Sequence, residues 1–184
     1  VGHHPGLIMY RSTSMSYADH DAYLASDLGA IGEVFNEKID PLVDQYHPYI
    51  DSYVWDNSHW PGDESTEGPL FTEVLRKWKP GGYASNQARE RMSQIALNQG
   101  WASDDHVWMW GTTIGGAPQE SIVIPHANWA SMDRDEEPFF MFLSRILGTE
   151  SAAGELMKEF SSTVESTNYQ VWVHREDLSM EQDD

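Results

Sequence analysis

The chain contains no cysteine, so disulfide bonds, thiolate catalysis and cysteine-ligated metal sites are excluded. It also lacks any apolar run that approaches the ~20 residues of a membrane-spanning helix. With 184 residues it is long enough to bury a hydrophobic core without a disulfide or a structural metal. We therefore expect a soluble protein made of one domain, residues 1–184, with an acidic tail at 179–184.

Basic residues are scarce, because 11 lysines and arginines stand against 30 aspartates and glutamates, which gives a net charge of −19. Binding to nucleic acid or to an anionic membrane needs a basic patch, and no run of the sequence supplies one. We expect neither as a partner. An acidic surface with few lysines also suits a salty medium, which favours a marine or halophilic source.

The chain begins with Val-Gly-His-His instead of methionine. This start is compatible with a trimmed chain or with a precursor from which a signal peptide was removed. A periplasmic or secreted location is therefore one expectation, and the localisation is otherwise open.

The spacing of apolar residues predicts the secondary structure. Repeats at three and four residues predict helices, and the first of these begins at Tyr17 with Ser16 as its N-cap and is broken by Pro41. The other helices are predicted over 71–78, 86–98, 139–146 and 152–164. Alternating or continuous apolar runs predict strands over 7–12, 49–55, 106–114, 121–127 and 169–175.

The strands at 106–114 and 121–127 flank a Gly-Gly-Ala-Pro connection, which predicts a β-hairpin. The simplest register places Val107 near His126 and Trp110 near Val123. One face then carries Val107, Met109, Ile122 and Ile124, and the other carries His106, Trp108, Trp110 and Val123. Both faces are apolar and helices can cover only one of them, so a second subunit is expected on the other.

This order of elements predicts an α+β chain, with a mixed or antiparallel sheet backed by helices and a helical insertion at about 57–104. The hairpin, the PHANW segment at 125–129, the helix with Phe139 and Phe142 and the YQVWVHR segment at 169–175 resemble the dimeric α+β-barrel superfamily. Within it, the NIPSNAP-like branch is the nearest resemblance. The resemblance implies ferredoxin-like halves, a homodimer or higher homo-oligomer, and a pocket between two sheets.

Aromatic and histidine side chains predicted on strands or just after them could line that pocket and hold a small aromatic ligand. By resemblance to barrel members that bind haem, a histidine could serve as an axial ligand, although the same side chains could simply pack a dimer interface. The candidate ligand-binding residues are His106, Trp108, Trp110, His126, Asn128, Trp129, Trp172 and His174.

The sequence gives little support for a metal site, a calcium-binding loop or a catalytic motif. His106 and His126 point to opposite faces in the predicted register, so they cannot share a metal ion with His174, and we predict no metal site. The loop with Asp56, Asn57, His59, Asp63, Glu64 and Glu67 lacks the EF-hand spacing and is expected to be a solvated acidic loop. There is no G-x-S-x-G nucleophile motif and no phosphate-binding loop, so catalytic residues and cofactors stay unidentified.

Two functions remain open from the sequence. The first is a self-associating ligand-binding or assembly protein of the dimeric α+β-barrel type. The alternative is a small-molecule enzyme, a cofactor-independent or haem-linked oxidoreductase or monooxygenase, that acts in the pocket between sheets.

Overall fold

A computed structural model describes residues 8–9, 16–26, 29–46, 49–62, 66, 68–81, 83–114, 119–133 and 137–178. The chain divides into two compact units, residues 1–48 (unit 1) and 49–184 (unit 2), and each is described by itself. The prediction of a single domain stays a prediction.

Among the described residues of unit 1, residues 17–42 contain the helices. Helix α1 spans Tyr17–Ala25 and α2 spans Gly29–Val34, followed by a π-helical turn, η1, at Phe35–Ile39 and a 3-10 turn, η2, at Asp40–Leu42. The predicted N-cap is confirmed as a capping box, in which Ser16 Oγ accepts from the Asp19 N–H and the Asp19 carboxylate accepts from the Ser16 N–H. The predicted strand at 7–12 lies almost entirely outside the described residues.

Unit 2 is built on a five-stranded sheet, with β1 at Asp51–Tyr53, β2 at Leu70–Trp78, β3 at Met109–Thr113, β4 at Gln119–His126 and β5 at Val164–Val173. The spatial order is β1-β3-β4-β2-β5, and all neighbours are antiparallel. A short 3-10 turn, η3, follows β1 at Trp55–Asn57. The predicted α+β class with an antiparallel sheet is confirmed.

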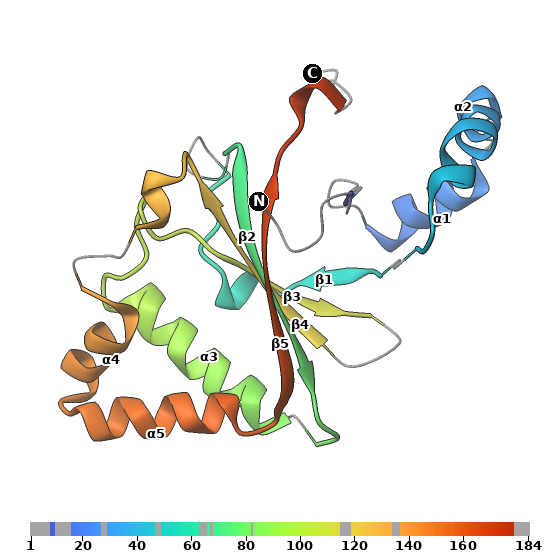
Figure 1. Ribbon diagram of the computed structural model, residues 1–184. Coiled ribbons are helices and arrows are strands. Elements are labelled where there is room, and N and C mark those ends of the chain that lie inside the picture. The colour runs from blue at the N-terminus through green and yellow to red at the C-terminus, as the bar shows by residue number, and fades with distance from the viewer. Residues whose placement is uncertain are drawn as a thin grey trace. The chain divides into compact units, whose positions relative to one another are not determined.

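Three helices lie on one side of this sheet (Figure 1). Helix α3 at Tyr83–Asn98 connects β2 to β3, and α4 at Phe139–Leu147 and α5 at Glu150–Ser161 connect β4 to β5. The chain from β2 onward thus runs β-α-β-β-α-β, which is compatible with a ferredoxin-like fold, and β1 adds a strand beside β3.

The core of unit 2 lies between the sheet and these helices. We call this side of the sheet the helix face and the opposite side the second face. Bulky side chains from both layers fill the core and exclude water from it. The buried cluster consists of Ala88, Met92, Ala96, Trp108, Trp110, Phe142, Leu143, Ala153, Leu156 and Phe160.

The prediction of a helix over 71–78, inside a helical insertion at 57–104, was wrong. The apolar positions Phe71, Val74, Leu75 and Trp78 match helical spacing, yet the segment is β2, a strand that pairs with β4 on one side and β5 on the other. In β2, apolar side chains lie on both faces, with Phe71 and Leu75 on the second face and Leu70 and Val74 on the helix face, so its sequence does not alternate. Tertiary pairing therefore overrides the local pattern.

The hairpin was predicted correctly, but its register was wrong by one residue. Met109 pairs with Val123 and Trp110 pairs with Ile122. Because side chains alternate along a strand, a shift of one residue moves every side chain of one strand to the other face relative to its partner strand. Trp110 shares the helix face with Ile122, whereas Met109 and Val123 lie on the second face.

Among the described residues, no helix combines the length and the apolar character needed to cross a membrane.

A glycine on β3 is required for the sheet to close against β1. A Cβ atom added to Gly111 would lie 2.5 Å from Ser121 Oγ and 3.1 Å from Asp51 Oδ2. We expect Gly111→Ala to lower the free energy of unfolding by about 1–3 kcal/mol through this overpacking. A Cβ atom added to Gly154, inside α5, would meet no atom within 4 Å. Gly154→Ala should therefore stabilise the protein by about 0.5–1 kcal/mol, and urea denaturation of both variants checks the opposite signs.

Candidate functional site

The centre of the second face carries a buried carboxylate, Glu73. On β2 it lies opposite Val123 of β4 and Gln170 of β5, and only 5% of its surface is exposed. The Trp172 indole donates a 2.9 Å hydrogen bond to Glu73 Oε2, and the Tyr49 hydroxyl donates one of 3.3 Å to Oε1. The carboxylate therefore holds two aromatic rings in defined positions.

Apolar side chains surround this carboxylate on the second face. Val123, which lies opposite Glu73, pairs on its other side with Met109. Phe71, two residues before Glu73 on β2, pairs with Trp172. Met109 is 3% exposed, whereas Phe71, Val123 and Trp172 are half-buried. A few fixed polar groups within a mainly apolar surface are typical of small-molecule sites.

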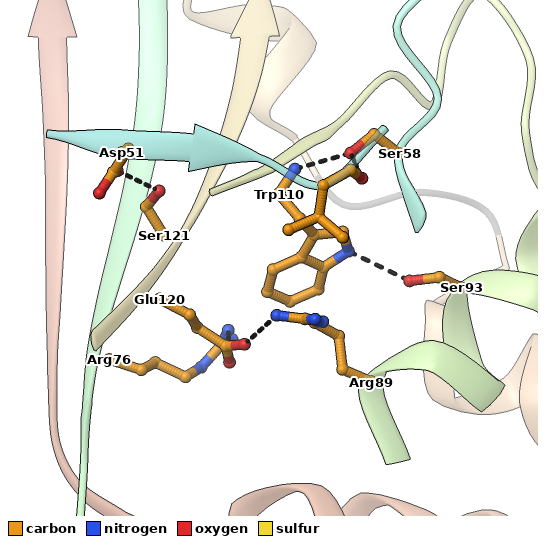
Figure 2. A network of polar contacts seen from close by, with 9 residues as sticks. Asp51, Ser58, Arg76, Arg89, Ser93, Trp110, Glu120 and Ser121 are labelled. Carbon is orange, nitrogen blue, oxygen red and sulfur yellow. Dashed lines mark hydrogen bonds and ion pairs between the residues drawn. The ribbon is translucent and has the colours of Figure 1, made fainter. Parts of the chain in front are cut away.

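A second carboxylate, Asp51 of β1 (Figure 2), lies on the same face, because it pairs with Thr113, which is on the same side of β3 as Met109. Its oxygens accept hydrogen bonds of 2.8 Å from Thr113 Oγ1 and from Ser121 Oγ. Gly111 leaves the room for this contact, since any side chain there would meet both Asp51 and Ser121. Hydroxyl donors thus tie the short edge strand β1 to β3 and β4.

The helix face holds a third carboxylate in a charged cluster (Figure 2). Glu120 of β4 is fully buried, with Oε2 2.9 Å from Arg89 Nη1 of α3 and Oε1 3.6 Å from Arg76 Nη1 of β2. Burial raises the pKa of Glu120, while Arg89 and Arg76 oppose this rise, and burial lowers the pKa of Arg76. Two cations thus face one buried anion.

Trp110 packs within this cluster. The guanidinium carbons of Arg76 and Arg89 lie 5.5 Å and 5.6 Å from the centre of its ring, and its indole N–H donates to Ser93 Oγ of α3 at 3.1 Å. Cation–π contacts of this kind stabilise desolvated arginines. The cluster joins β2, β4 and α3 inside the core, so we assign it a structural role.

His126, at the end of β4, belongs to a chain of polar groups. Its Nε2 lies 2.9 Å from Thr72 Oγ1, which in turn lies 3.4 Å from the Tyr169 hydroxyl. Burial lowers the pKa of His126, and a hydrogen bond that involves the Ser131 backbone partly opposes this. The imidazole is therefore neutral at neutral pH.

The predicted pocket residues do not come together. Trp108 and Trp110 are buried on the helix face, where the Trp108 indole donates to the Asn57 carbonyl at 2.8 Å. Trp172 pairs with Phe71, and Phe71 pairs with Pro125 of β4. Pro125 and Ile122 are an odd number of positions apart, so they point to opposite faces, and Trp172 therefore lies on the second face. One pocket cannot contain both Trp110 and Trp172.

The remaining candidates lie at strand ends. His106 stacks on Trp101 at a ring distance of 4.0 Å, and the His174 N–H donates to the Pro69 carbonyl. Asn128 shapes the turn after β4, where its Oδ1 accepts from the Ser131 N–H at 3.0 Å. The side chain of Trp129 in this turn is exposed.

Sequence reasoning missed Glu73, Arg76, Arg89 and Glu120. Glu73 and Arg76 lie in the segment that was interpreted as a helix, and Arg89 and Glu120 are ordinary charged residues in an acidic chain. The one available signal was the mixture of charges and apolar residues in the LFTEVLRKW segment of β2. A surface helix explains that mixture equally well.

Among the residues that the structure describes, no three histidine, aspartate or glutamate side chains gather closely enough to hold a metal ion. Asp63, Glu64 and Glu67 of the predicted acidic loop lie outside the described residues. In the described part of that loop, His59 forms an isolated β-bridge with Trp108.

Comparisons with models of known protein families, with curated proteins and with solved structures find no match to this chain. Its function must therefore be inferred from the geometry of the side chains.

The charged cluster can be tested by removing its anion. Glu120→Gln leaves two buried guanidinium groups without a counter-charge, so we expect the free energy of unfolding to fall by about 3–5 kcal/mol. The exposed ion pair between Glu137 and Arg145 is the control, since Glu137→Gln should leave the midpoint of urea denaturation nearly unchanged. Equal losses in the two variants, measured by urea denaturation, would contradict a special role for Glu120.

The lowered pKa of His126 predicts a pH dependence of stability. The unfolded chain binds the proton of His126 more readily than the folded chain does. The free energy of unfolding is therefore highest above the ordinary pKa of 6.5, and it decreases as the pH falls below that value. Between about pH 7.5 and pH 5, His126→Asn should lose less stability than the parent protein. If His126→Asn loses as much stability as the parent over this pH range, the assignment is wrong.

Proposed function

We propose that this protein binds a small, largely apolar ligand at the second face and that it self-associates, without acting as a catalyst. The observation that carries the ligand-binding proposal is the position of Glu73, which is buried at the sheet centre and hydrogen-bonded to Trp172 and Tyr49. A buried carboxylate is costly unless it is satisfied by donors. Here the donors belong to two aromatic rings, which it orients.

The chemistry of this surface selects the class of ligand. The half-buried rings of Phe71 and Trp172 offer area for an aromatic or aliphatic body. Glu73 acts as a positioning residue, because its hydrogen bond fixes the plane of the Trp172 indole. The negative charge beneath the rings disfavours anionic ligands, so a neutral or cationic aromatic compound fits best.

Self-association in the form of a dimeric α+β barrel, with two second faces packed together, stays a proposal that derives from the family resemblance. The low exposure of Met109 and Glu73 already within one chain reduces the apolar area that such packing would cover. The outer edge of β5, a different surface of unit 2, favours self-association more strongly.

The second candidate is a small-molecule enzyme, and the same carboxylate favours it. Glutamate is a residue type that serves as a general base, and Glu73 lies beside the half-buried rings where the ligand is proposed to bind. A haem-linked form would need a histidine ligand, and His126 would have to give up its contact with Thr72 to serve as one.

Binding of the neutral dye Nile red tests the ligand site. We expect a saturable rise in dye fluorescence with quenching of tryptophan emission. Trp172→Phe removes the indole N–H, and Glu73→Gln removes the charge that orients it, so each should weaken binding by roughly tenfold, about 1.4 kcal/mol.

Trp129→Phe is the matched control, because Trp129 is an exposed tryptophan in the turn after β4, outside the strands of the sheet. This variant should bind the dye as the parent does. Absence of saturable binding, or equal losses in Trp129→Phe and Trp172→Phe, would contradict the proposed site. Melting curves of each variant separate loss of binding from loss of fold.

A further inference from the structure

Strand β5 is a long edge of the sheet. It spans ten residues, Val164–Val173, and pairs with Leu70–Trp78 of β2 with a register shift at Glu165, and among the described residues no strand pairs with its other side. The His174 N–H donates to Pro69 next to β2. Backbone groups alternate in direction along an antiparallel strand, so the N–H and C=O groups of Thr167, Tyr169, Val171 and Val173 point away from β2.

From Ser166 to Val173 this edge lacks the features that usually prevent strands of different molecules from pairing, and the register shift in β5 lies before this part, at Glu165. Lysine, proline, bulges and short length protect most edges. The opposite edge, β1, has only three residues and carries Asp51. In β5, by contrast, residues 166–173 contain no charge and no proline, and Tyr169 and Val173 are 60% and 58% exposed.

We propose that the outer edge of β5 pairs antiparallel with β5 of a second copy of this chain, about a two-fold axis at Gln170. This inference rests on the proposed self-association and names its surface. The two sheets would then form one continuous sheet with the helices of both copies on the same side. Pairing would satisfy the outward backbone groups from Thr167 to Val173 in each copy.

The charges at the two ends of this edge support that register. About a two-fold axis at Gln170, Tyr169 lies opposite Val171 and Thr167 lies opposite Val173 of the other copy. Glu165, at the register shift before Ser166, and Arg175, two residues beyond the end of β5, then lie near each other across the interface. Both side chains are exposed, at 49% and 61%, so they can reach across the interface while they keep or exchange their contacts with Lys77 and Asp177.

Sedimentation equilibrium of the full chain over micromolar concentrations tests the interface. Thr167→Pro removes an outward N–H that β2 does not use, and proline is tolerated at such edge positions. We expect the dimer dissociation constant to rise by at least about tenfold, the equivalent of 1.4 kcal/mol. Thr167→Val keeps the N–H and should dimerise as the parent does.

A charge exchange tests the register and does not depend on the proline variant. Glu165→Lys and Arg175→Glu should each weaken the dimer about tenfold, and the double variant should restore it to within about threefold. A parent dimer that neither Thr167→Pro nor the charge variants weaken would overturn this interface while leaving self-association in place. A monomer at every concentration would overturn both, and the Nile red experiment would still decide the ligand site.

Discussion

The hydrogen bonds that β2 makes on both of its sides determine the arrangement of unit 2. Residues Leu70–Lys77 pair with β4, and the same residues pair with β5. This pairing brings the last strand of the chain next to the segment before α3, although about ninety positions separate them. It also places Glu73 and Arg76 on opposite faces at the centre of the sheet, since they differ by an odd number of positions.

Buried carboxylates are stabilised by different interactions on the two faces of the sheet. On the helix face, Glu120 is neutralised by two arginines, and Trp110 packs against both guanidinium groups. On the second face, Glu73 and Asp51 accept hydrogen bonds from indole and hydroxyl groups. The ion pairs on the helix face connect α3 to the sheet. The hydrogen bonds on the second face orient aromatic rings at a surface, and for this reason we place the ligand site on the second face.

The acidic character of the chain sets conditions on any assembly. A net charge of −19 on each copy opposes association, so an interface has to lie where charge is locally low or balanced. Residues 166–173 of β5 carry no charge, while Glu165 lies just before them and Arg175 lies two residues beyond the end of the strand. Association along this edge would thus avoid most of the repulsion between two copies.

Local signals were sufficient for several elements. The capping box at Ser16, the helix that ends at Asn98, the hairpin and the phenylalanine-rich helix α4 follow from spacing and from residues with strong conformational preferences. The α+β class followed from the order of such elements. The absence of cysteine and the scarcity of basic residues excluded whole classes of chemistry by composition alone.

Tertiary structure decided the rest. The LFTEVLRKW segment has helical spacing, and only its pairing with β4 and β5 makes it a strand. The hairpin sequence admits two registers, and packing of Trp110 against α3 selects the one that sends Met109 to the other face. The candidate site depends on both outcomes, because Trp172 reaches Glu73 only when β2 and β5 pair, and Met109 shares the face of Glu73 only in the observed hairpin register. Local preferences act over a few residues, whereas register and partner depend on contacts across the whole domain.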